Sequence, residues 1–151
     1  MNTPQLAFAF RWNSAADLAS FESQGNEEAV AAIRKLTGAG GQSLYLAGPV
    51  GSGRSHLLQA ACGEVSRAGG TAVYVPLADY LDTSPTLLEG LESLSLVALD
   101  DVHCISGHAA WEEAVFYCYN RLRETGTQLV VAAADAPDAI GIQLPDLTSR
   151  L

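Results

Sequence analysis

The fold of this chain is decided by residues 48–55, which read Gly-Pro-Val-Gly-Ser-Gly-Arg-Ser. This stretch follows the apolar run 43–47 and precedes a helix-like segment from His56 to Ala68. It fits the phosphate-loop pattern G-x-x-x-x-G-K-[ST] except that Arg54 replaces the lysine. Glycines let backbone N–H groups close around phosphate oxygens, and a helix that begins there adds a favourable dipole. The stretch therefore predicts a phosphate-binding loop, with an ordinary glycine-rich turn as the alternative.

Arg54 changes what such a loop is able to do. A lysine is a compact charge that reaches the β- and γ-phosphates of a nucleotide, whereas a guanidinium is a wider, planar group. The phosphate charge is still countered, but the geometry needed for hydrolysis is altered. Ser55 stands where a hydroxyl ligates Mg²⁺. We expect the phosphates of ADP or ATP to contact Gly48, Gly51, Ser52, Gly53, Arg54 and Ser55.

The composition indicates one domain, or part of one, with enough apolar residues for a core. The chain has 151 residues, a formal net charge of −9 and 8 Lys and Arg, which argues against a broad nucleic-acid-binding face. No apolar stretch approaches the ~18 residues of a membrane span, and the first residues lack the pattern of a signal peptide. The cysteines and histidines show no metal-site spacing, including Cys62, Cys104 and Cys118. We expect reduced cysteines, no zinc and a cytoplasmic location.

Short strands alternate with helices along the chain, which indicates an α/β fold with a parallel sheet covered on both faces. Residues 1–13 are predicted to form an extended tail, and 14–151 an α/β nucleotide-binding subdomain. Strands are expected over 43–47, 71–75, 95–99 and 128–133. Helices are expected over 27–36, 56–68 and 109–124, with a further helix or two within 80–94.

Two acids follow the third expected strand. Asp100 and Asp101 come directly after the apolar run 96–99, at the carboxyl edge of the sheet, where open α/β folds bind ligands. Asp100 is expected to hold Mg²⁺ through water, and Asp101 to orient an attacking water. The alternative is a simple strand-to-loop turn, in which aspartate is common. Asp135 follows the strand 128–133 at the same edge, where it either approaches the γ-phosphate or forms a turn before Pro137.

Together these motifs resemble the AAA+ ATPases, and within them the replication initiator DnaA and its relatives. The resemblance covers about residues 21–151 and rests on GPVGSGRSH at 48–56, LDDVH at 99–103, AADAP at 133–137 and LPDLTSRL at 144–151. The last stretch resembles the family's box VII, which implies that Arg150 is an arginine finger offered to a neighbouring subunit. The resemblance also implies that His56 belongs to the nucleotide site, and that the fifth strand and helical lid of an AAA+ module are missing from this chain.

Within this family, three features favour the DnaA-homologous regulators of initiation over the initiator. They are Arg54, the stretches 91–97 and 144–147, and residues 5–10, Gln-Leu-Ala-Phe-Ala-Phe, which resemble a motif that docks on the DNA polymerase sliding clamp. In an extended segment, alternating large apolar groups fill a hydrophobic groove while the glutamine donates or accepts a hydrogen bond at one end. The residues concerned are Gln5, Leu6, Phe8 and Phe10. The alternative is an edge strand that packs on its own domain.

The resemblance thus implies a regulator that docks on the clamp and promotes hydrolysis of ATP bound to DnaA. Its own turnover is expected to be weak, its contact with DNA only indirect, and a homo-oligomer is possible. Asp101 departs from the regulators and follows the double aspartate of DnaA. A DnaA-like or helicase-loader ATPase that acts directly on DNA or on the helicase therefore stays open as the alternative. A small-molecule kinase fits the phosphate loop but not the acids and box VII.

Overall fold

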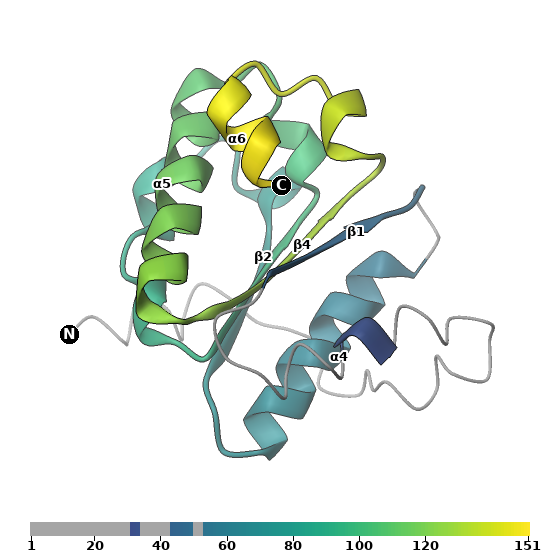
Figure 1. The fold of residues 1–151 in the computed structure, drawn as a ribbon, viewed down its shortest axis with the longest axis vertical. Helices are drawn as coiled ribbons and strands as arrows, with labels where there is room; N and C mark the ends of the chain where they lie inside the picture. Colours follow the sequence, from purple (N-terminus) through teal and green to yellow (C-terminus); the bar gives the residue numbers. More distant parts are fainter. Residues whose placement is uncertain (1–30, 34–42, 50–52) are drawn as a thin grey trace.

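The structure, a computed structural model, describes residues 31–33, 43–49 and 53–151. A four-stranded sheet lies at its centre, in the order β1-β4-β3-β2, and every neighbouring pair is parallel (Figure 1). The strands are β1 (Ser43–Ala47), β2 (Ala72–Pro76), β3 (Leu96–Asp100) and β4 (Gln128–Ala133). The predicted α/β fold with a parallel sheet is confirmed. Within the described residues β1 pairs on one side only, so it forms an edge of the sheet.

Helices cover the two faces of the sheet separately. Helix α4 (Arg54–Arg67) lies on one face, and α5 (Ala109–Thr125) with the short α6 (Pro145–Arg150) lies on the other (Figure 1). Residues 31–33 are also helical, and Ile33 belongs to the core on the α4 face. Both faces of a parallel sheet are buried in this way because each βαβ crossover places its helix over the sheet.

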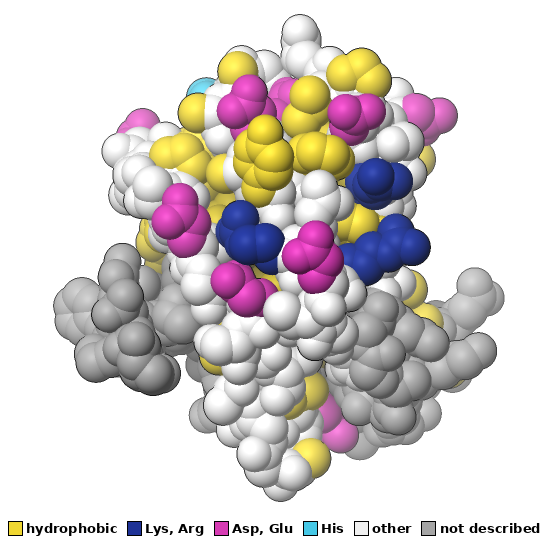
Figure 2. All heavy atoms as spheres, turned by 60° about the vertical axis from the view of Figure 1, so that its left-hand side comes forward, with side chains coloured by type: hydrophobic (Ala, Val, Ile, Leu, Met, Phe, Trp, Pro, Cys, Tyr) yellow, Lys and Arg dark blue, Asp and Glu magenta, His cyan; other side chains and the backbone are white. Residues whose placement is uncertain are grey.

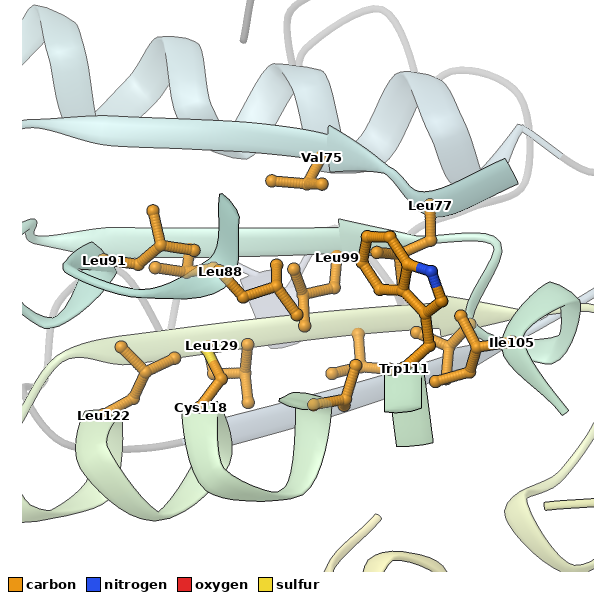
Figure 3. Close-up of a cluster of buried hydrophobic side chains, with 14 of the residues drawn as sticks. Val75, Leu77, Leu88, Leu91, Leu99, Ile105, Trp111, Cys118, Leu122 and Leu129 are labelled. Carbon is orange, nitrogen blue, oxygen red and sulfur yellow. The ribbon is translucent and has the colours of Figure 1, made fainter. Parts of the chain in front are cut away.

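The period of two along the strands assigns residues to these two faces. Ala98 of β3 and Val130 of β4 pack in the cluster under α4, whereas their neighbours in sequence pack in the cluster under α5. Figure 3 shows the second cluster, in which Leu99 and Leu129 of the sheet face Cys118 and Leu122 of α5. All four side chains are at most 3% exposed. The strands are therefore buried on both sides, which holds their carboxyl ends in one fixed edge.

The expected helices within 80–94 are wrong in type. The structure has three short 3₁₀ helices in and just before this region: η1 (Leu77–Asp79), η2 (Pro85–Leu88) and η3 (Leu91–Ser93). Pro85 begins η2 because its φ is fixed, and Gly90 precedes η3 at φ +85°, a left-handed conformation that glycine adopts without steric cost. The apolar residues still reach the core, since Leu88 and Leu91 are fully buried against α5.

The outward face of α5 carries side chains of mixed character. Figure 2 shows this face, where hydrophobic side chains are surrounded by both acidic and basic ones. Tyr117 is 55% exposed, and Arg121 pairs with Glu92 at 3.3 Å. A face on which acids and bases alternate is not a continuous basic stripe of the kind that binds nucleic acid backbones.

Candidate nucleotide site

The candidate site lies where β1, β3 and α4 meet at the carboxyl edge of the sheet. Gly48 follows β1 and donates its N–H to the carbonyl of Ala133 at the end of β4, at 3.0 Å. Gly53 stands just before α4 with φ +91°, a left-handed conformation that requires a glycine here. Helix α4 then begins at Arg54, two residues earlier than expected. A strand and a helix therefore flank the glycine-rich stretch, as predicted, and residues 50–52 lie outside the described part of the chain.

Asp100 is the centre of a buried hydrogen-bond network. The side chain is fully buried, and its Oδ2 accepts hydrogen bonds from the Ser55 hydroxyl at 2.5 Å and the Tyr74 hydroxyl at 2.7 Å. Its Oδ1 accepts the backbone N–H of Asp101 at 2.8 Å. These three donors give both oxygens of the buried carboxylate a hydrogen-bond partner, as buried polar groups require. The structure thus places Ser55 and Asp100, the two residues predicted to ligate Mg²⁺, in direct contact with each other.

Tyr74 is a site residue that the sequence analysis missed. It lies on β2, next to β3 in the sheet, and its hydroxyl reaches Asp100 across the strands. Burial raises the pKa of Tyr74, and its hydrogen bond to Asp100 raises it further. A tyrosine inside a strand of otherwise small or β-branched residues is a weak signal for such a contact. Its aromatic ring alone would explain its place in the core equally well.

Arg54 points into the edge of the sheet, toward the two acids. Its Nη2 donates to Asp101 Oδ1 at 2.9 Å, its Nη1 donates to the carbonyl of Gly48 at 2.6 Å, and its Nε lies 3.5 Å from Asp100 Oδ1. The residue is 7% exposed, and Nε has no hydrogen-bond partner in the described structure. The acids that the sequence assigned to a metal and to an attacking water are therefore both engaged by the arginine of the phosphate loop.

This arrangement does not fit a bound Mg²⁺. The ion demands oxygen ligands in near-octahedral order at about 2.0–2.1 Å and usually keeps several waters. Here the oxygens of Asp100 already accept protons from Ser55, Tyr74 and the backbone, and a guanidinium stands where the cation would need room. Among the described residues no group of three or more His, Cys, Asp or Glu is placed to hold a metal ion. Mg²⁺ ligation by Ser55 and Asp100 stays a prediction that this geometry does not favour.

Asp101 has an unusual backbone. Among the described residues, Asp101 is the non-glycine residue that has a positive φ, which is 57°. Aspartate adopts this left-handed conformation more readily than most residues do. The carboxylate of Asp101 forms an ion pair with Arg54 at 2.9 Å, so this residue combines a left-handed backbone with a charged contact.

Asp135 is exposed and is not joined to these acids by a described contact. Its carboxylate accepts the N–H of Ala136 at 2.8 Å, as in a turn before Pro137, the alternative to a contact with the γ-phosphate. Its carbonyl accepts the hydroxyl of Tyr45 at 2.6 Å, and burial together with two nearby aspartates raises the pKa of Tyr45 to about 12. His56 is exposed on the first turn of α4. Nucleotide contacts by Asp135 and His56 stay predictions.

Box VII forms α6, which packs on α5. Leu147 is fully buried, whereas Arg150 is exposed at the last residue of the helix. Glu112 of α5 holds the start of this segment: its carboxylate is 2% exposed and accepts the N–H groups of Gln143 at 3.0 Å and Leu144 at 2.8 Å. The sequence analysis missed Glu112. The sequence did contain a signal for its burial, because Glu112 lies three residues before Val115 and therefore on the same face of the helix.

Several predicted site residues lie outside the described part of the chain. They are Gly51 and Ser52 of the loop and Gln5, Leu6, Phe8 and Phe10 of the tail. The described cysteines form no disulfide with one another, and Cys62 and Cys118 are buried. The helices of the described residues are too short or too polar to cross a membrane.

Comparisons with known proteins agree with the motifs. The bacterial DnaA ATPase domain matches residues 18–151. A crystal structure of a DNA replication initiation factor has a TM-score of 0.82 and 26% identity, over 92% of this chain and 47% of its own. The initiator DnaA bound to AMPPCP and single-stranded DNA has a TM-score of 0.79 and 26% identity, over 91% and 47%. The chain spans about half the length of these two proteins.

A third structure extends the comparison to DnaI. It has a TM-score of 0.63 and 18% identity, over 91% of this chain and 82% of its own. At this identity the likeness shows the fold alone.

Proposed function

Because this chain belongs to the bacterial DnaA ATPase domain family, we propose that it is a nucleotide-binding regulator of chromosomal replication initiation, of the type of Hda, the DnaA-homologous regulator. It binds ADP or ATP at residues 48–55, docks on the DNA polymerase sliding clamp and promotes hydrolysis of DnaA-bound ATP. It acts in the cytoplasm and meets DNA only through the clamp. The bound AMPPCP in a DnaA structure of 26% identity supports an adenine nucleotide.

The observation that supports a regulator best is the contrast between two arginines. Arg54 is 7% exposed and its charge is offset by Asp100 and Asp101. Arg150 is exposed at the end of α6, where it is open to a second protein. A guanidinium that reaches a neighbour's γ-phosphate stabilises the charge that develops in the transition state. Such an arginine contributes about 10³–10⁵ in rate in related phosphoryl-transfer systems.

The arrangement at Asp101 supports weak turnover in the chain's own site. A water-orienting carboxylate must accept a proton or a hydrogen bond from water. Asp101 Oδ1 instead accepts from Arg54 at 2.9 Å, and the turn at this residue directs it there. The chain therefore holds its nucleotide and acts on that of a partner. In this proposal Gly48, Gly53 and Ser55 contact the phosphates together with residues 51 and 52.

The test is the hydrolysis of radiolabelled ATP bound to purified DnaA, in the presence of the clamp loaded on DNA. Arg150→Ala in the full-length protein is expected to remove stimulation while nucleotide affinity and clamp binding stay unchanged. Arg123→Ala is the matched control, because Arg123 is also exposed and lies in the last turn of α5. Stimulation by Arg150→Ala at the wild-type rate would end the proposal.

Clamp docking has its own test, since the segment concerned lies outside the described residues. Leu6→Ala with Phe8→Ala is expected to abolish capture by immobilised clamp without changing the thermal unfolding of the protein. The alternation of large apolar groups after Gln5 motivates this experiment. A double variant that lowers the unfolding temperature would instead assign the segment to the core.

A DnaA-like initiator or helicase loader is the second candidate, because Asp101 keeps the double aspartate of DnaA. Such a protein would act directly on DNA or on the helicase. The net charge of −9 speaks against direct DNA binding, which depends on basic residues. Titration of a labelled single-stranded oligonucleotide separates the two: tight, salt-dependent binding without the clamp supports the initiator.

A further inference from the structure

We propose that the guanidinium of Arg54 takes the place of a divalent cation, so that this site binds adenine nucleotide without Mg²⁺. The inference rests on the proposed function in one respect, namely that the phosphates lie beside Gly48, Gly53 and the start of α4. It goes further because it identifies Arg54 as the positive group that lies between the phosphates and the two acids at the end of β3. In most phosphate-loop sites a metal ion makes that connection.

The donors of Arg54 are divided as this role requires. A guanidinium has five N–H donors in a fixed plane. One Nη1–H binds the carbonyl of Gly48, one Nη2–H binds Asp101, and the Nε–H lies on the side of Asp100. One N–H therefore remains on each terminal nitrogen. Arginine N–H groups form strong, charge-assisted hydrogen bonds with phosphate oxygens. The group can thus hold the acids and a phosphate at the same time, as a bridging metal does.

The charges favour this arrangement over an added ion. Arg54 contributes one positive charge and the two aspartates contribute two negative charges, so these three side chains together leave a formal charge of −1. A divalent ion at Asp100 would lie beside the buried guanidinium and be repelled by it, with little water between them to screen the repulsion. A lysine at this position would extend a single point charge and leave the acids open to a metal.

The hydrogen bonds of Asp100 support the same conclusion independently of charge. Ser55 and Tyr74 both donate their hydroxyl protons to Asp100 Oδ2. In a metal site of the usual kind the serine oxygen would ligate the ion, and waters of the ion would donate to the carboxylate. Here protein hydroxyls, a backbone N–H and Arg54 already surround the carboxylate. Donors of the protein therefore occupy the positions around Asp100 that water molecules bound to a metal ion would otherwise take.

The experiment measures ADP binding to the full-length protein by isothermal titration, once with Mg²⁺ in excess and once with EDTA. For the wild type we expect dissociation constants that agree within about threefold, well under the tenfold that 1.4 kcal/mol represents. Arg54→Lys restores the usual motif and is expected to bind with Mg²⁺ but to lose at least about tenfold in EDTA. Arg67→Lys at the exposed end of α4 is the matched control and should behave as the wild type.

The outcomes separate the two proposals. A wild-type protein that loses about tenfold or more in EDTA overturns the role of Arg54 but leaves the nucleotide site intact. A protein that binds ADP under neither condition overturns the nucleotide site and this inference with it. The comparison of wild-type protein with and without Mg²⁺ needs no variant to fold. A metal requirement that appears in Arg54→Lys alone is the result expected.

Discussion

Replacing Glu112 by alanine removes a buried carboxylate that joins three separate segments. Its Oε1 accepts the N–H groups of Gln143 and Leu144, and its Oε2 accepts that of Gly107 at 2.8 Å. Glu112 itself is 2% exposed on α5. The carboxylate therefore connects the turn before α5 with the entry to α6, the helix that ends in Arg150.

The magnitude follows from what happens to the three N–H groups. A buried donor left without a partner costs about 1–3 kcal/mol. Gly107 and Gln143 lie at the surface, beside a pocket of about 220 Å³, so water can replace part of what is lost. We therefore take the lower end for each donor and expect Glu112→Ala to lower the free energy of unfolding by about 3 kcal/mol. Glu112→Gln keeps the volume and one acceptor oxygen, and is expected to cost about half as much.

The assay is urea unfolding followed by tryptophan fluorescence, because Trp111 stands next to the substituted residue. Glu113→Ala is the matched control: it is the adjacent acid on the same helix, it is exposed, and it is expected to change stability by no more than about 0.5 kcal/mol. Hydrogen exchange should also show faster exchange of the Leu144 amide in the Glu112 variants. Equal stabilities for Glu112→Ala and Glu113→Ala would refute this account of the carboxylate.

Further predictions concern protons and thiols. The unfolded chain loses the Tyr45 proton near pH 10, whereas burial and two nearby aspartates hold the folded pKa at about 12, so stability should fall as pH rises across that interval. The free energy of unfolding of Tyr45→Phe, measured with urea at a series of pH values, should fall less steeply with pH than that of the wild type. Parallel curves for the two proteins would contradict this. Burial raises the pKa of Cys62 and of Cys118 to about 12, so a thiol reagent should modify the half-buried Cys104 first. Mass spectrometry of the labelled native protein tests this. Labelling of Cys62 as fast as Cys104 would contradict the prediction.

The strands were the part of the fold that the sequence predicted best. The bounds 43–47 and 128–133 agree with β1 and β4, because each is an apolar run between polar or glycine-rich segments. The region 80–94 was predicted less well. Its apolar residues are spaced as in a helix, but the fixed φ of Pro85 and the left-handed Gly90 divide it into single turns. Local backbone constraints outweighed hydrophobic spacing there.

The site was predicted as a set of residues but not as a set of contacts. Spacing and strand ends placed Ser55, Asp100 and Asp101 at one edge, where the structure has them. The direction of Arg54 was not predictable, since a motif fixes where a side chain starts and the surrounding charges decide where it points. Tyr74 and Glu112 were missed for a related reason: each is a polar group within an apolar segment, and its partner is distant in sequence.

The positive φ of Asp101 limits which residues this position accepts, apart from any chemistry of the acid. Aspartate, asparagine and glycine adopt left-handed backbone readily, whereas other residues pay roughly 1–2 kcal/mol. Asp101→Asn therefore keeps the turn and removes the charge that faces Arg54, while Asp101→Ala loses both. The difference in stability between these two variants isolates the backbone contribution. The shape of the turn and the charge of its side chain are therefore two separate requirements at one position, and asparagine meets only the first of them.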